Sequence, residues 1–189
     1  MFFFLYYSIS MNTNREFWMS ITELINYEVS DQGRVRNIQT GRILKGRNNG
    51  NGYLTVNIRN KKNKFQNFYI HRLVGFAFLI DKKKKGQNCI DHIIPYKADN
   101  RACNLRWCTA LQNSWNKPKI TRENYGNGSI YKGVRKVGEN FTAQITDKGK
   151  LISLGSFETE IEAAQIYNLI AERIFGEYAK LNQIDDSKL

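Results

Sequence analysis

The residues of this chain best suited to chemistry lie between positions 91 and 113. Asp91 and His92 are adjacent, and an aspartate carboxylate is a hard oxygen ligand of the kind that Mg²⁺ prefers. A neutral imidazole, with an ordinary pKa of about 6.5, can accept a proton from water near neutral pH. Asn113 adds a neutral amide oxygen for the same cation, and Arg106 offers a positive charge for a phosphate. The set suits one divalent cation and one general base acting on a phosphodiester.

Each of these residues also has an ordinary structural explanation when it is taken alone. An Asp–His pair is commonly a surface pair, Asn104 a turn residue and Asn113 an amide on a helix surface. Their combination on one short segment favours chemistry. We expect strands over 90–94 and 105–108, and a helix from Thr109, because Thr109 and Gln112 have the spacing of a capping box.

Two blocks of regular structure flank this segment. The pattern before it predicts strands over 27–29, 34–36 and 53–58, a turn over 48–52, a core from Trp18 and Ile21, and a helix over 71–78 that buries Leu73, Val74 and Phe78. The pattern after it predicts strands over 131–137, 140–146 and 151–157. A helix follows from the capping box Thr159–Glu162 to Gly176, with an apolar stripe of Ala163, Ala164, Tyr167, Ile170, Ala171 and Ile174. This is a three-stranded sheet packed on one helix.

The charge favours a polyanionic partner. The 189 residues carry a net charge of +12, with 41% hydrophobic and 13% aromatic residues, so the chain folds and is strongly basic. Residues 15–88 hold 15 Lys/Arg against 5 Asp/Glu. Residues 129–157 hold 5 Lys/Arg against 2 Asp/Glu, whereas residues 158–189 hold 3 Lys/Arg against 7 Asp/Glu. This division is expected if the last sheet contacts phosphates and its helix faces away from them. A solvated basic surface is the alternative.

Several classes are disfavoured. Cys89, Cys103 and Cys108 form no even disulfide framework and lack tight zinc-knuckle spacing, so we expect reduced thiols, with a zinc site as the alternative. Residues 1–10 are apolar but too short to span a bilayer and lack the features of a signal peptide; we expect them to be an upstream extension. The chain is therefore expected to be intracellular, in the cytoplasm or nucleus of a host, and not secreted.

The central residues resemble HNH endonucleases of the ββα-metal class, in the homing branch whose final His is replaced by Asn. The resemblance rests on His71-Arg72-Leu73-Val74, Ala77-Phe78, Asp91-His92-Ile93, Asp99-Asn100-Arg101, Asn104-Leu105-Arg106-Trp107, Thr109 and Asn113. It implies that Asp91 and Asn113 bind one Mg²⁺ or Mn²⁺ ion per active site. It also implies that His92 is the general base and that Asn104 braces the loop and orients His92.

The flanking blocks resemble DNA-contacting modules. The first is similar to the NUMOD type through Trp18, Tyr27-Glu28-Val29-Ser30, Gly33-Arg34-Val35-Arg36 and Gly52-Tyr53. The last is similar to the plant APETALA/ethylene-response domain through Tyr131-Lys132-Gly133-Val134-Arg135, Leu154-Gly155-Ser156-Phe157, Glu162-Ala163-Ala164, Tyr167 and Leu181-Asn182. Leu151 and Ser153 replace the Arg and Trp of the plant domains, so their sequence preference is not expected here. The residues expected to contact DNA are Arg34, Arg36, Arg106, Lys132, Arg135, Lys136, Gln144 and Thr146.

We therefore expect a modular α+β protein, with a ββα-metal nuclease core flanked by a small β-rich module and a DNA-binding domain of three strands and one helix. The expected divisions are a tail 1–14, a NUMOD-type module 15–68, a nuclease core 69–118, a linker 119–128, the DNA-binding domain 129–183 and a tail 184–189. The expected function is metal-dependent hydrolysis of double-stranded DNA by a homing-type enzyme of a mobile element, with no membrane and no small-molecule cofactor. The oligomeric state is open.

Two alternative functions and three minor assignments accompany this expectation. A DNA-binding regulator could use the same scaffold without cutting, and RNA could be the substrate. His71 is expected to be structural at a helix start, with a phosphate contact as the alternative. The loop Lys82–Lys85 is either a solvated surface or a phosphate-tracking segment. Tyr131 and Phe141 are expected in the core, although either could stack on a base.

Overall fold

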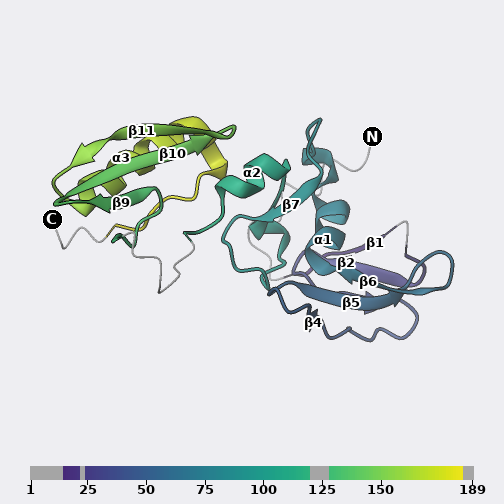
Figure 1. Ribbon diagram of the computed structural model, residues 1–189. Helices are drawn as coiled ribbons and strands as arrows, with labels where there is room; N and C mark the ends of the chain where they lie inside the picture. Colours follow the sequence, from purple (N-terminus) through teal and green to yellow (C-terminus); the bar gives the residue numbers. More distant parts are fainter. Residues whose placement is uncertain (1–14, 22–23, 120–127, 185–189) are drawn as a thin grey trace. The chain divides into compact units, whose positions relative to one another are not determined.

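The computed structural model describes residues 15–21, 24–119 and 128–184 and confirms a mixed α+β architecture of small sheets and few helices (Figure 1). The chain divides into two compact units. The first comprises residues 1–83 and 96–107, and the second residues 84–95 and 108–189. Among the described residues, no helix is long and apolar enough to cross a membrane.

The first unit contains two antiparallel three-stranded sheets and one helix. The strands of the sheets are β1 (Trp18–Ser20), β2 (Tyr27–Ser30) and β3 (Val35–Asn37), then β4 (Arg47–Asn48), β5 (Leu54–Arg59) and β6 (Phe65–Tyr69). They are followed by α1 (Ile70–Phe78), η2 (Ile80–Lys82), η3 (Ala102–Asn104) and β8 (Leu105–Cys108). The core is formed by Val29, Val35, Val56, Ile58, Ile70, Leu73 and Val74, which are all buried. The predicted helix and its buried residues, Phe78 included, are confirmed.

Periodicity alone did not predict β1, β4 and β6. β6 is the clearest case, because four of its five side chains are exposed and no apolar alternation marks it. Its existence depends on its partner: all of β6 pairs antiparallel with residues 55–59 of β5, where Val56 and Ile58 are buried.

The loop before β8 packs against the β2–β3 turn. Gly33, in that turn, has φ +78°, and a Cβ there would lie 2.8 Å from the carbonyl carbon of Asn100. Nearby, the amide of Ala102 donates to the carbonyl of Asp31 at 2.8 Å. The indole Nε1 of Trp107 donates to the carbonyl of Leu79 at 2.7 Å, which fixes β8 to the end of α1. Residues 96–107 are thus part of the first unit although β7 precedes them in the chain.

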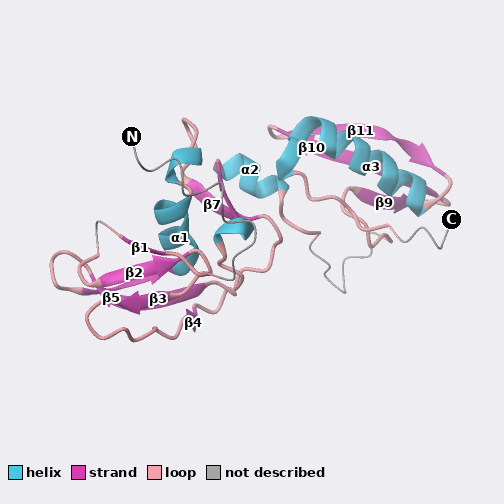
Figure 2. Cartoon of the chain, turned by 180° about the vertical axis from the view of Figure 1, so that it is seen from behind, coloured by secondary structure: helices cyan, strands magenta, loops and turns pink. Residues whose placement is uncertain are grey.

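The second unit contains β7, α2 and the last block of the chain (Figure 2). Its elements are β7 (Cys89–His92), α2 (Ala110–Trp115), β9 (Val134–Val137), β10 (Asn140–Asp147), β11 (Lys150–Phe157), α3 (Glu160–Phe175) and η4 (Gly176–Tyr178). The three strands of the last block form an antiparallel sheet in the order β11-β10-β9.

The last block, residues 128–184, is called the C-terminal module below. Its helix α3 covers one face of the sheet (Figure 2), where Ala143 and Ile145 of β10 meet Ala163, Ala164 and Ala171 of α3, all buried. Alanine at these positions allows the helix backbone to approach the sheet closely. The capping box at the start of α3 and its end at Gly176 are confirmed.

Two expectations for the C-terminal module are corrected. β9 begins at Val134 rather than Tyr131, because Gly133 has φ +76° and passes close beneath the ring of Tyr167, where a Cβ would lie 2.0 Å from a ring carbon. Ile174 does not belong to the buried stripe of α3: it is 37% exposed, whereas its neighbour Phe175 is 5% exposed. Phe175 lies one turn beyond buried Ala171, on the same side of the helix.

Candidate active site and nucleic-acid interface

Asp91 and His92 are the last two residues of β7, and both are buried, with 7% and 4% exposure. Consecutive side chains in a strand point to opposite sides unless the strand ends or bends. β7 ends at His92, and a bend follows directly over Ile93 and Ile94. The strand expected over 90–94 therefore ends two residues earlier, at His92, and the acid and the imidazole lie at its terminus.

The helix α2 is placed by the capping box that the sequence predicted. The Thr109 hydroxyl accepts from the amide of Gln112 at 3.1 Å, and the Gln112 side chain accepts from the amide of Thr109 at 2.8 Å. Asn113 lies one turn into α2, where its amide donates to the carbonyl of Thr109 at 3.0 Å, and its side chain is half-buried. α2 also contacts β7.

Asn116 joins α2 to the end of β7, and sequence reasoning missed it. This C-cap residue of α2 is 4% exposed. Its Nδ2 donates to the Oδ2 of Asp91 at 3.0 Å and to the carbonyl of His92 at 2.7 Å, with a longer contact to the carbonyl of Ile93 at 3.4 Å. All three partners are acceptors, so the NH₂ end of the amide must face them. The available signal was a second asparagine three residues after Asn113, which is one helical turn.

Asn104 stabilises the loop before β8. It is 4% exposed; its Nδ2 donates to the carbonyl of Asp99 at 3.1 Å, and its amide donates to the carbonyl of Arg101 at 2.9 Å. Asp99 in turn accepts two bonds from the Arg101 guanidinium, at 2.8 and 2.7 Å. Asn104 thus bonds to two residues of the loop before β8. In β8 itself, Arg106 is half-buried between the buried residues Leu105 and Trp107, so it points to the opposite face.

The donor set fits a hard divalent cation. Asp91 could supply a carboxylate and Asn113 an amide oxygen, and Mg²⁺ commonly takes one or two such protein ligands while it keeps water and phosphate oxygens. The described residues hold no group of three or more His, Cys, Asp or Glu side chains that could bind a metal. This disfavours a zinc site within the described part of the chain, because structural zinc sites need such groups of side chains.

Arg34 and Arg36 lie beside Trp18 and are paired with acids. The Nε of Arg34 donates to Glu16 at 2.7 Å, and the Nε of Arg36 donates to Glu28 at 2.9 Å. The guanidinium of Arg36 lies 4.0 Å from the centre of the Trp18 ring, so Trp18 is half-buried beneath a cation rather than in the core. Partly exposed pairs are worth only about 0–1 kcal/mol, so a phosphate can compete for both arginines.

The open face of the β9–β11 sheet, opposite α3, carries exposed or half-buried polar side chains. On β10, Gln144 and Thr146 alternate with the buried Ala143 and Ile145. On β9, Arg135 pairs with Thr142 on that same face. The other members of the face are Leu151, Ser153 and Ser156 of β11, set by their pairing with Thr146, Gln144 and Thr142.

Lys136 does not share this face with Arg135. It pairs with Phe141, which packs against the core beneath α3, and its Nζ lies 5.9 Å from the centre of the Phe141 ring. The expectation that both cations face the same way is wrong for a physical reason: adjacent residues of a strand point to opposite sides.

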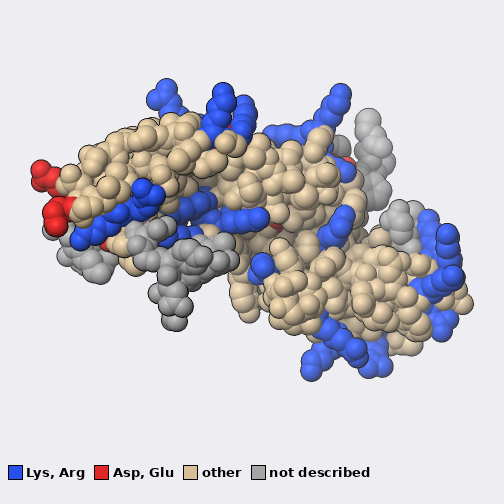
Figure 3. Space-filling view, viewed as in Figure 1, with Lys and Arg blue, Asp and Glu red and all other residues tan. Residues whose placement is uncertain are grey.

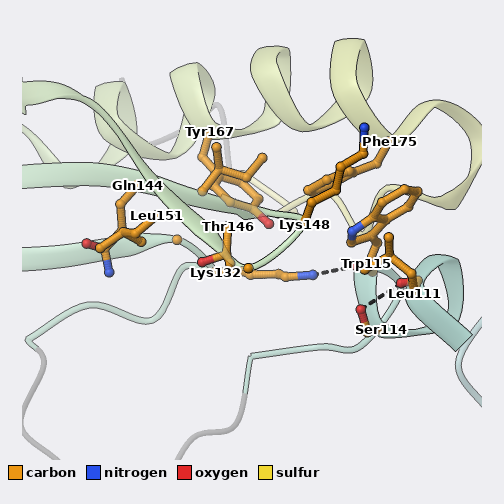
Figure 4. Close-up of a pocket in the computed structure, with 13 residues that line it drawn as sticks. Leu111, Ser114, Trp115, Lys132, Gln144, Thr146, Lys148, Leu151, Tyr167 and Phe175 are labelled. Carbon is orange, nitrogen blue, oxygen red and sulfur yellow. Dashed lines mark hydrogen bonds between the residues drawn. The ribbon is translucent and has the colours of Figure 1, made fainter.

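Lys132 lies before β9 rather than in a strand, and its ammonium is engaged within the protein. Its Nζ donates to the carbonyl of Trp115 at 2.6 Å (Figure 4). Burial lowers the pKa of Lys132 to about 8, with a smaller contribution from the charge of Lys180. The expectation that Lys132 occupies a strand position is corrected.

The described surface is predominantly basic. On the face shown in Figure 3, lysine and arginine side chains outnumber acidic ones. The loop Lys82–Lys85 is exposed, as expected, although the Nζ of Lys83 lies 4.6 Å from the centre of the Trp107 ring. His71 is 7% exposed within α1, with ring centres 5.1 Å from Tyr53 and 5.5 Å from Tyr69. Its burial among aromatic rings supports the structural role expected for His71.

Comparison with known proteins finds similarity to HNH endonucleases. Residues 16–59 match the NUMOD4 motif. The chain is 39% identical over 117 residues to the uncharacterized HNH endonuclease L560 of Acanthamoeba polyphaga mimivirus, covering 61% of this chain and 58% of the relative. It is 38% identical over 106 residues to L247 of the same virus, covering 55% of this chain and 26% of the relative.

The DNA endonuclease I-HmuI of Bacillus phage SP01 is 34% identical over 92 residues, covering 49% of this chain and 51% of the relative. A solved structure described as DNA binding and cleavage by the HNH homing endonuclease I-HmuI has a TM-score of 0.47 and 33% identity, covering 53% of this chain and 56% of that one. The chain thus spans between about a quarter and three fifths of the length of these relatives.

Proposed function

We propose that this chain is an HNH-type DNA endonuclease of the homing kind, in which β7 and α2 form the cleavage centre. The observation that carries the proposal is the amide of Asn116, which binds both the carboxylate of Asp91 and the backbone of His92. This fixes the helix that bears Asn113 to the strand that bears the acid and the imidazole. The similarity to named HNH endonucleases supports the same reading.

In the proposed mechanism, Asp91 and Asn113 would hold one Mg²⁺ or Mn²⁺ ion, which would stabilise the negative charge that develops during phosphodiester hydrolysis. His92 takes a proton from water as the water oxygen attacks phosphorus. The bond from phosphorus to the 3′-oxygen breaks, and that oxygen receives a proton from solvent. The products are 5′-phosphate and 3′-hydroxyl ends. Asn104 holds the loop before β8 and serves to orient His92.

DNA contact is assigned to three surfaces. Arg34 and Arg36 exchange their glutamate partners for phosphates, and Arg106 binds a phosphate from β8. On the C-terminal module, Arg135, Gln144 and Thr146 reach base edges or phosphates from the open face. Amide and guanidinium groups suit the donor–acceptor pattern of the major groove. Lys136, on the other face, and Lys132, held by α2, are assigned no base contact.

The direct test is cleavage of a supercoiled plasmid. We expect nicked or linear DNA with Mg²⁺ or Mn²⁺, intact plasmid with EDTA, and ends that ligate only if they carry 5′-phosphate. Excess RNA should compete poorly if duplex DNA is the substrate. Binding of duplex DNA without cutting under every metal condition would instead support the non-cleaving regulator.

A further inference from the structure

The C-terminal module is fixed to the same turn of α2 that supports the cleavage centre. Trp115, the last residue of α2, stacks on Phe175, the last residue of α3, with ring centres 4.5 Å apart and planes inclined by 17° (Figure 4). Phe175 is buried. Such aromatic pairs contribute about 0.5–1.5 kcal/mol beyond the area they bury.

A second contact reinforces the stack. The Nζ of Lys132 donates to the carbonyl of Trp115. Carbonyl groups in the last turn of a helix lack partners within the helix and favour a cation. Lys132 keeps this contact although burial disfavours its charged form. The module therefore binds both the ring and the backbone of Trp115.

A third contact reaches the segment before β7. The Nε2 of Gln87 donates to the hydroxyl of Tyr178 at 3.1 Å, across 91 residues of sequence. Both side chains are buried, at 6% and 8% exposure. The module therefore contacts the chain on both sides of the candidate site: at Gln87, ahead of Asp91, and at Trp115, beside Asn116.

The open face of the sheet continues toward α2. A pocket of about 410 Å³ lies beside the Trp115–Phe175 stack. Its lining includes Gln144, Thr146 and Leu151 of the open face and Leu111 and Ser114 of α2 (Figure 4). A DNA backbone lying on the open face would therefore meet the helix that carries Asn113.

We infer that Trp115 is a positioning residue, which sets the number of base pairs between the DNA contacted by the open face and the phosphodiester that is cut. This inference rests on the proposed function. A module held only by a random-coil tether of ten residues would be positioned to within about 16–19 Å. At about 3.4 Å per base pair, that corresponds to an uncertainty of roughly five base pairs. Docking of the module on Trp115 removes this uncertainty in the cut position.

The test uses the full chain and a duplex that the plasmid assay has shown to be cut, labelled at both 5′ ends. The variants are Trp115→Ala, Trp115→Phe, Phe175→Leu and a Gly-Ser-Gly-Ser insertion between Asn124 and Tyr125. Leu169→Ala is the matched control, because Leu169 is on α3 and is 61% exposed. Wild type, Trp115→Phe, Leu169→Ala and the insertion should cut at one position. Trp115→Ala should spread cutting over roughly five adjacent bonds, as the span above implies, and Phe175→Leu over fewer.

Two results would overturn the inference. One is a single, unmoved cut position in both Trp115→Ala and Phe175→Leu. The other is a spread caused by the insertion alone, which would mean that the tether sets the distance. If Trp115→Ala is inactive, the cut positions of Phe175→Leu test the inference instead, because this variant leaves the residues of α2 unchanged.

Hydrogen exchange without DNA separates this inference from the proposed function. Phe175→Leu should increase exchange at residues 110–116 and leave β10 protected. Unchanged exchange there would contradict the docking. If wild type cuts no duplex but the exchange result holds, the proposed function fails while the joint between α2 and the module stands.

Discussion

The end of β7 and the open face of the β9–β11 sheet both present polar side chains, but they hold them in opposite ways. Asp91, His92 and Asn116 are each less than 10% exposed, and Asn116 binds both of the others. Arg135 and Thr146 on the open face are exposed. The first arrangement restricts side-chain motion before any substrate arrives, whereas the second leaves side chains free to adjust to a partner.

Under the proposed function, this difference suits catalysis at the end of β7 and DNA contact on the open face. Catalytic groups must be held close to their productive geometry, because small misplacements are costly in rate. Groups that contact DNA gain affinity mainly from phosphate neutralisation, which tolerates motion. Substitutions at the end of β7 should therefore affect cleavage more than binding, and substitutions on the open face should do the reverse.

The sharpest test of this contrast is His92→Ala. We expect cleavage to fall by about 10²- to 10⁴-fold, the usual value of a positioned general base. DNA affinity, measured by filter binding with Ca²⁺ in place of Mg²⁺, should change little. An equal loss of cleavage and affinity would show that His92 has a structural role.

Asn116→Ala should have the next largest effect. Loss of its hydrogen bonds should reduce cleavage by about 10- to 100-fold, as expected when a group that orients a metal ligand is removed. It should also lower the free energy of unfolding by about 1–3 kcal/mol, because buried acceptors lose their donor. Ser114→Ala is the matched control on α2, since its exposed hydroxyl bonds only to the carbonyl of Leu111.

The proposed metal dependence of cleavage gives Asn116→Ala a further readout. In Asn116→Ala the Mg²⁺ concentration for half-maximal cleavage should rise, because Asp91 is less well oriented. A loss of stability without a shift in metal dependence would assign Asn116 to folding alone.

Separation along the chain explains which residues of the candidate site could be predicted from the sequence. Asp91 and His92 are neighbours in the chain, and Thr109 and Gln112 fix the phase of α2 through a local capping box, so short-range patterns suffice. Asn116 was missed because its partners are 24 and 25 residues away and only the fold brings them together.

On the β9–β11 sheet, the sequence could not predict which way each cation points. Composition identified a basic sheet, but the face that each cation occupies depends on where β9 starts and how it pairs. With β9 beginning at Val134, Arg135 faces outward and Lys136 lies beside Phe141. Lys132, three residues before Arg135, is turned to Trp115 by a bond that no local pattern signals.

These neighbouring cations provide the third prediction. Arg135→Ala should weaken DNA binding several-fold and reduce the slope of log K against log salt by about one, the value for one lost phosphate contact. Lys136→Ala should change that slope less. A titration of a labelled duplex at several salt concentrations measures both. A larger change at Lys136 would place the DNA on the α3 side of the sheet.

The smallest expected effect concerns Lys132 and pH. Burial, with a lesser effect of Lys180, lowers its folded-state pKa from 10.5 to about 8. Between these values the unfolded state binds more protons than the folded state, so this lysine's contribution to stability rises as pH increases from about 8 to 10.5. Relative to Lys132→Met, wild type should therefore gain stability over that range. Urea midpoints of both proteins at a series of pH values check the sign; a constant difference would contradict it.

The close approach of Gly33 to Asn100 bears on how such proteins can be recombined. Because these two segments pack together, a chimera that receives only residues 15–83 would place the Gly33 turn against a foreign loop. The donor must supply residues 96–107 as well, and β7 lies between these and residues 15–83 in the chain. Exchange of the N-terminal part therefore requires exchange of β7, whereas a crossover after Pro118 separates only the C-terminal module and must preserve a partner for Trp115.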